Sequence, residues 1–379
     1  MAGALVVKEK CKKKATAPAT LQRGLPVVAG RRADAAKDLI AKVRREAARK
    51  RPQIAGTGFL EENAVKPTTM AQYKRAATAF MEFCKAEDSS WQNLMELDAM
   101  LVDYFEARFW EGGPAHEATL LLAALPALLT AVPRPIGSSL PRAARSMKGW
   151  LRLAPPAQRL PLPWVLICII MAWFLRRGLR HHALALALQF CTYLRPGEVM
   201  SLRGSQLIPP TAAAGQAYTK WGINIGPLES GIPGKTGIFD ESLMIDRMLW
   251  LNPWLKILKE NAGDMDRVWP FPLHRHALLF ARAVHDSGLQ SLKPTLYAIR
   301  HGGASEDLLR GTRSLEAVFR CGRWRAWSSV RRYGKEAKLQ AALAKLPVKL
   351  LDYGQTLEHT IAAAVLDPRL LPRLPRGMA

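Results

Sequence analysis

Two arginines, a tryptophan and a tyrosine fall at spacings that suit chemistry on a phosphate group. The first block is 191-CTYLRPGEV-199, where Pro196 favours a helix start and places Arg195 at the helix N-terminus. Glu198 follows about one turn later, so its carboxylate can orient the guanidinium of Arg195 for a bidentate phosphate contact. An Arg–Glu pair at this spacing is more often a structural ion pair, and that alternative stays open.

The second block lies about 100 residues further along the chain. Arg300 and His301 precede two glycines, and Tyr333 stands nine residues after Trp324. Tyr333 is flanked in the sequence by arginines and a lysine (331-RRYGK-335), and these cations would stabilise its phenolate electrostatically. The structural alternative is a basic helix with a packed tyrosine and tryptophan.

In this order and separation the two blocks resemble the tyrosine recombinase family, which includes phage integrases and the integrases of Crypton-like and DIRS-like mobile elements. The resemblance makes Arg195 the first catalytic arginine, with Glu198 as its brace, and Arg300 the second arginine. It places Trp324 at the family's His or Trp position and makes Tyr333 the nucleophile.

Two further residues enter through the resemblance. The segment 231-GIPGKTGIFDESL-243 resembles the family's β-hairpin and nominates Lys235 as the general acid. Tyr297 stands where the family usually has histidine, and tyrosine is the weaker proton acceptor at neutral pH. His301 lies one helical turn further on and can take over that role.

The resemblance implies a site-specific recombinase or integrase that cleaves and rejoins DNA through a 3′-phosphotyrosyl intermediate. Two guanidiniums would stabilise the negative charge of the transition state, and no metal or other cofactor is expected. The expected partner is double-stranded DNA, bound by a homotetramer. The expected compartment is the nucleus if the source is eukaryotic, and otherwise the cytoplasm or nucleoid.

Two other functions remain open. A type IB topoisomerase has the same active-site plan, but would relax supercoils without pairing two sites. A degenerate recombinase would only bind DNA, and Tyr297 is the feature that supports this alternative. A peripheral membrane protein is disfavoured, because the cations lie within globular sequence and not along one amphipathic helix.

The elements around these residues predict a mainly helical protein: an all-helical domain, then an α+β catalytic domain that is helical with a small antiparallel sheet. We expect a basic disordered arm over 1–65, a helical, SAM-like core-binding domain that binds DNA over 66–153 and a proline-rich linker over 154–163. The catalytic domain is expected over 164–350 and a C-terminal helix and tail over 351–379. Asp98 is expected to cap the second helix.

One helix face in the first domain is a candidate DNA-binding surface. Its four cations fall within a third of the helix circumference and have no acid among them: Arg142, Arg145, Lys148 and Arg152. An ordinary solvated face is the alternative. For the C-terminal helix, docking on a neighbouring subunit and packing on its own domain are equally open.

Composition supports a polyanionic partner. The 379 residues include 55 Lys and Arg against 31 Asp and Glu, a formal net charge of +24. No apolar run reaches 18 residues, so no membrane-spanning helix is indicated. Five dispersed cysteines favour neither a disulfide framework nor a zinc site. The histidine clusters 181–182 and 274–276 are expected to be solvated or capping residues.

Overall fold

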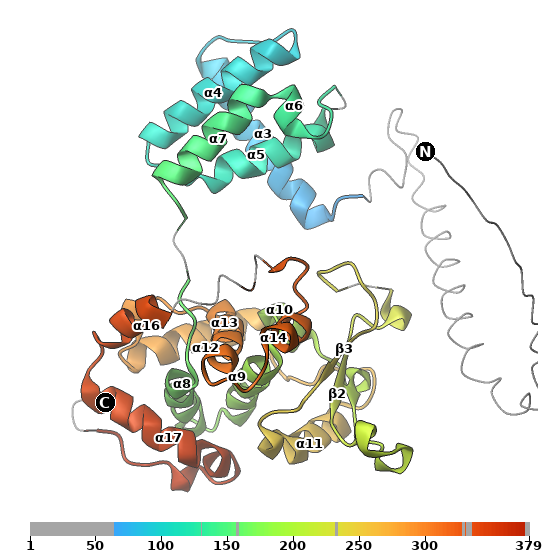
Figure 1. The fold of residues 1–379 in the computed structure, drawn as a ribbon, viewed down its shortest axis with the longest axis vertical. Helices are drawn as coiled ribbons and strands as arrows, with labels where there is room; N and C mark the ends of the chain where they lie inside the picture. Colours follow the sequence, from blue (N-terminus) through green and yellow to red (C-terminus); the bar gives the residue numbers. More distant parts are fainter. Residues whose placement is uncertain are drawn as a thin grey trace, which may run out of the picture. The chain divides into compact units, whose positions relative to one another are not determined.

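The computed structural model describes residues 64–129, 131–156, 159–231, 234–327, 330 and 336–375 (Figure 1). The expected basic arm falls almost wholly outside the described residues, as does Tyr333. The fold class is confirmed, because the described chain is mainly helical and contains a three-stranded antiparallel sheet. No described helix is long and apolar enough to cross a membrane.

The first group of helices has its own hydrophobic core. It comprises α3 (Pro67–Ala86), α4 (Leu94–Trp110), α5 (His116–Leu128), α6 (Ile136–Ser139) and α7 (Pro141–Leu153). Phe80, Leu101, Phe105 and Trp150 are buried in that core. Aromatic side chains at helical spacing therefore hold these helices together.

The prediction that Asp98 caps the second helix is wrong. Asn93 caps α4, accepting hydrogen bonds from the backbone N–H groups of residues 95 and 96. Asp98 is buried, and its carboxylate instead accepts from the backbone N–H groups of Arg142 and Ala143 at 2.9 and 2.8 Å. Asp98 thus caps the basic helix α7. The sequence could not reveal this contact, because α4 and α7 meet only in the folded chain.

The second group of helices is built around α8 (Trp164–Arg176) and α9 (Arg180–Thr192), which pack on each other. Almost every residue of both helices is buried, which explains why α8 is apolar on all sides. α13 (Leu296–Leu309) packs on α9, and α17 (Val348–Leu366) packs on α8. Among the described residues the other α-helices of this group are α10 (Pro196–Ser201), α11 (Asn252–Ala262), α12 (Leu273–Asp286), α14 (Leu315–Gly322) and α16 (Glu336–Leu343).

The sheet lies between α10 and α11 in the chain. Its strands are β1 (Leu207–Ile208), β2 (Gly222–Ile225) and β3 (Glu241–Met244), in the order β1-β2-β3 with both pairs antiparallel. Ile223 faces Leu207 on one side and Leu243 on the other, and all three are buried. The β2–β3 connection carries Lys235, as expected of a hairpin.

The C-terminal helix belongs to the core of its own domain. Leu350, Leu357, Ile361 and Val365 on α17 are buried in the same cluster as α8. Of the two open alternatives, packing on its own domain is therefore the one that the structure supports. Periodicity in the sequence reveals an apolar face, but it cannot say which surface that face covers.

Two of the histidines are not solvated, contrary to expectation. His182 on α9 and His276 on α12 are buried, and their Nδ1 atoms lie 2.7 Å apart. Phe271 stacks on His182 with ring centroids 3.6 Å apart. The two rings are part of the core, which their spacing in the sequence gave no means of predicting.

Candidate active site

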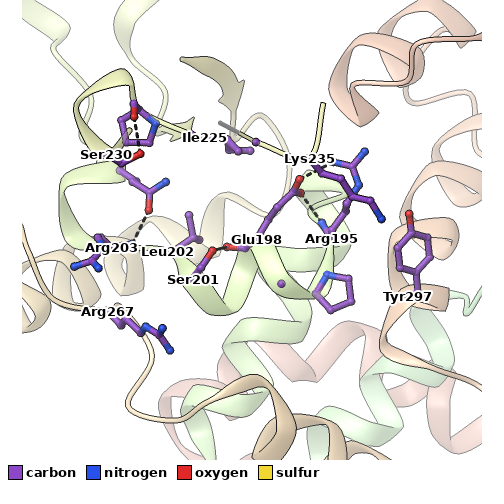
Figure 2. A pocket seen from close by; sticks show the side chains of 16 residues that line it. Arg195, Glu198, Ser201, Leu202, Arg203, Ile225, Ser230, Lys235, Arg267 and Tyr297 are labelled. Carbon is purple, nitrogen blue, oxygen red and sulfur yellow. Dashed lines mark hydrogen bonds and ion pairs between the residues drawn. The ribbon is translucent and has the colours of Figure 1, made fainter. Parts of the chain in front are cut away.

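The first block forms a compact unit at the N-terminus of α10. Tyr193 ends α9 in the left-handed conformation (φ 52°), and Arg195 is extended and precedes the helix. Glu198 accepts two hydrogen bonds from Arg195: the backbone N–H at 2.8 Å and Nη1 at 2.6 Å (Figure 2). The expected brace is therefore present, and it fixes both the backbone and the guanidinium of Arg195.

A third arginine, which sequence reasoning missed, shares this carboxylate. Nη2 of Arg323 lies 2.6 Å from Oε2 of Glu198, and the Arg323 side chain is only 5% exposed. Its Nε lies 3.9 Å from Glu241 at the start of β3. Arg323 stands between Gly322 and Trp324, so it directly precedes the tryptophan that the resemblance nominates.

Arg300 is close to this unit but fully buried. Its terminal nitrogens donate to the carbonyl oxygens of Tyr193 and Gly322, and its guanidinium lies 4.9 Å from the ring centroid of Trp324. Arg300 therefore ties the end of α9 to the end of α14. It does not line the pocket described below, so a phosphate in that pocket would meet Arg195 first.

Tyr297 and His301 lie on one face of α13, as expected from their spacing. Their rings meet edge to face with centroids 5.2 Å apart, and the guanidinium of Arg159 lies 5.4 Å from the Tyr297 centroid. Tyr297 is half-buried and lines the same pocket as Arg195. The residue at the family's histidine position thus faces the site.

The pocket has a volume of about 610 Å³ and gathers residues from separate stretches of chain. Arg195 and Glu198 come from the first block, Lys235 from the β2–β3 connection, and Tyr297 from α13 (Figure 2). Lys235 is exposed. Three of the nominated catalytic side chains therefore converge on one cavity, together with the brace.

The electrostatics of the site follow from burial and from this sharing of charge. Burial opposes ionisation of Glu198, but Arg323 and then Arg195 lower its pKa below the ordinary value. Burial would lower the pKa of Arg195, but Glu198 and then Tyr297 raise it above the ordinary value. Burial, and next the charge of Arg195, lower the pKa of Arg300. Three guanidiniums, of Arg195, Arg300 and Arg323, thus lie near two carboxylates, Glu198 and Glu241, which leaves an excess of one positive charge.

The turn that follows α14 is shaped by a glycine. A Cβ on Gly322 would lie 1.8 Å from the Trp324 ring, so only glycine allows the indole to fold back against this helix. Trp327 then stacks on Phe319 with centroids 4.2 Å apart. Tyr333 itself, the predicted nucleophile, lies outside the described residues.

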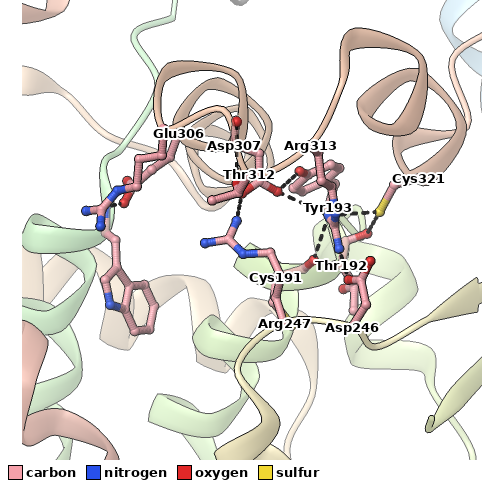
Figure 3. Close-up of polar contacts among 12 residues, drawn as sticks. Cys191, Thr192, Tyr193, Asp246, Arg247, Glu306, Asp307, Thr312, Arg313 and Cys321 are labelled. Carbon is pink, nitrogen blue, oxygen red and sulfur yellow. Dashed lines mark hydrogen bonds and ion pairs between the residues drawn. The ribbon is translucent and has the colours of Figure 1, made fainter. Parts of the chain in front are cut away.

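A second polar network surrounds Tyr193, which lies two residues before Arg195. Asp307 is fully buried and accepts from the hydroxyl of Tyr193, from Thr312 at 2.6 Å and from Arg313 at 3.2 Å (Figure 3). Arg247 also pairs with this carboxylate. Since the Tyr193 carbonyl accepts from Arg300, the network supports the site without touching its pocket.

The predicted basic stripe is at the surface of the first group of helices. None of its four side chains is buried, whereas Ala143 and Trp150 on α7 are. The geometry leaves the stripe accessible, and its contact with DNA stays a prediction. Among the described residues, no group of three or more His, Cys, Asp or Glu could hold a metal ion.

Comparisons with known proteins find little similarity. No family model matches the chain, and no curated protein matches it. Among solved structures, the chain is similar to the XerH site-specific recombinase bound to its difH substrate in a pre-cleavage complex. The identity is 13% and the TM-score 0.35, over 65% of this chain and 78% of the other. Similarity this low identifies neither family nor chemistry, so the functional argument rests on the residues.

Proposed function

We propose that this protein is a DNA strand transferase of the tyrosine type, acting as a site-specific recombinase or integrase. The observation that carries the proposal is the convergence of a braced Arg195, Lys235 and Tyr297 on one pocket, although they lie far apart in sequence. Guanidinium and ammonium groups at a site rich in positive charge suit a phosphodiester substrate. The net charge of +24 agrees with a DNA partner.

The proposed reaction is an exchange of phosphodiester bonds. The Tyr333 oxygen attacks the scissile phosphorus, and the bond from phosphorus to the 5′-oxygen breaks. Lys235 gives a proton to that leaving oxygen, and Tyr297 or His301 assists removal of the phenolic proton. Arg195 stabilises the charge on the transition state. Attack by the 5′-hydroxyl of another strand reverses the step, so the bond energy is conserved.

The test is a covalent adduct between protein and DNA. Purified protein is incubated with nicked or fragmented genomic duplex DNA, denatured, and examined for DNA that migrates with the protein. We expect an adduct in the wild type and none in Tyr333→Phe, because phenylalanine lacks the attacking oxygen. Equal DNA binding by the two proteins, measured by gel shift, is the control. An adduct that persists in Tyr333→Phe would contradict the assignment of the nucleophile.

Two observations favour a second function, DNA binding without cleavage. Arg300 donates both terminal nitrogens to carbonyl groups, and Tyr297 replaces the usual histidine. Under this alternative the wild type gives no adduct but binds DNA in a salt-sensitive way. Restoration of the adduct by Tyr297→His would then locate the defect.

A topoisomerase would form the same adduct, so a different assay separates it from a recombinase. Relaxation of a supercoiled plasmid without exchange products indicates a topoisomerase. Pairing of two duplexes by four subunits, seen as a change in mass on DNA, supports the proposed recombinase.

A further inference from the structure

The pocket contains a second pair of cations that the proposed reaction does not use. Arg203 follows α10 and Arg267 lies between α11 and α12, and both side chains line the same pocket as Arg195. In Figure 2 they lie on the side of Arg195 opposite to Tyr297. Both are exposed. The pocket therefore has a reactive end and a separate basic end.

The backbone brings this arginine pair together. Arg203 and Arg267 are partners in an antiparallel bridge, flanked on its two sides by backbone hydrogen bonds of 2.8 and 3.2 Å. Opposed residues in such a bridge place their side chains on the same side. The two chain segments approach closely, since a Cβ on Gly204 would lie 1.6 Å from the Gly263 carbonyl oxygen. One terminal nitrogen of Arg203 also donates to the Met265 carbonyl, which holds its guanidinium near this bridge.

This arrangement places two cations close together at the surface, where solvent screens part of their repulsion. Like charges directly opposite each other on neighbouring strands repel. Among the described residues that line the pocket, Glu198 is the only acid, and it is engaged by Arg195 and Arg323. Asp264, on the same loop as Arg267, lies 3.5 Å from Lys259. A ligand phosphate between the two arginines would relieve the repulsion through charge-assisted hydrogen bonds.

We propose that Arg203 and Arg267 bind a backbone phosphate of the DNA other than the reacting one. The pocket then takes two phosphates of the same substrate, one at Arg195 and one at the arginine pair. DNA is the favoured ligand because a polymer supplies phosphates at regular intervals to both ends of one cavity. The claim that the ligand is DNA rests on the proposed function. The claim that the arginine pair binds a phosphate does not.

The test is the salt dependence of DNA binding by the full-length protein. Affinity for a short duplex is measured between about 50 and 200 mM salt for Arg203→Gln and Arg267→Gln. Removal of one phosphate-binding cation should reduce the slope of log affinity against log salt by about 1. Lys256→Gln is the control, because it removes one charge from a side chain that is 72% exposed and lies outside the pocket.

Two further measurements keep the outcome clear. Arg203→Lys keeps the charge and should retain the wild-type slope, which separates loss of charge from loss of structure. Slopes for both glutamine variants equal to that of Lys256→Gln would overturn the inference. A reduced slope in a protein that forms no DNA adduct would reject the proposed reaction and leave the phosphate site standing.

Discussion

At the scale of single residues, Glu198 organises the site. It fixes the backbone and side chain of Arg195 and also pairs with Arg323, which comes from the second block of the sequence. A buried carboxylate between two cations is worth more as a positioning group than as a source of stability. Its removal would release the guanidinium of Arg195 and leave Arg323 with Glu241 alone.

Glu198→Gln tests this role. Arg195 would lose its acidic partner and Arg323 the nearer of its two, so we expect the free energy of unfolding to fall by about 3 kcal/mol. Under the proposed function, formation of the DNA adduct should slow at least about tenfold. Urea unfolding and the adduct assay provide the measurements. Glu316→Gln is the control, because its exposed pair with Arg320 should contribute less than about 1 kcal/mol.

At the scale of elements, the position of the site depends on how closely α13 approaches its neighbours. A Cβ on Gly302 would lie 1.8 Å from the carbonyl oxygen of Leu162, and one on Gly303 would lie 2.1 Å from that of Phe190. The two glycines that follow His301 are therefore packing residues. They allow α13 to bring Arg300 within reach of the carbonyl that ends α9.

Gly302→Ala should disrupt this approach. The added methyl group meets backbone, which cannot swing away, so we expect a loss of about 3 kcal/mol or more in unfolding free energy. Gly197→Ala in α10 is the comparison, since nothing lies within 4 Å of its Cβ position. That change should alter stability by no more than about 1 kcal/mol. Similar unfolding midpoints for the two variants would contradict the packing argument.

The contact between α9 and α12 should make stability depend on pH. Burial lowers the pKa of His182 to about 4 and that of His276 to about 3, so both are neutral in the folded protein. Their contribution is complete above the unfolded pKa near 6.5 and is lost progressively as the pH falls toward the folded values. Between pH 7 and 5 the loss should be on the order of 3 kcal/mol.

Urea unfolding at several pH values measures this dependence. The double variant His182→Leu/His276→Leu should have a flatter profile between pH 7 and 5, because the unfolded state no longer takes up two extra protons. An unchanged profile would show that other groups control it.

At the scale of the whole molecule, α17 closes the core of its own domain. Its buried face packs on α8, so a chain cut near residue 350 would lose core packing. Such a truncation cannot report on assembly alone. The buried face of α17 is therefore open to a second subunit only if the helix leaves its own core.

Ile361→Ala and Leu366→Ala on the same helix separate these effects. Ile361 is 1% exposed, and its truncation should cost about 2–5 kcal/mol in unfolding free energy. Leu366 is 65% exposed, and its truncation should cost about 0.5 kcal/mol or less. Thermal or urea unfolding measures both. Equal effects would mean that α17 is not packed as described.

The sequence alone determined the mainly helical fold class and the pairing of Arg195 with Glu198, whereas the hairpin bearing Lys235 was expected from the family resemblance. The first two features depend on local periodicity and on spacings within one helical turn, which a sequence displays directly. Only the tertiary structure decided that Arg323 shares Glu198, that Arg300 is buried, that Asp98 caps α7 and that Arg203 faces Arg267. Each of these arrangements joins segments distant in the chain, and its energy depends on burial and close approach, which appear only when the chain folds.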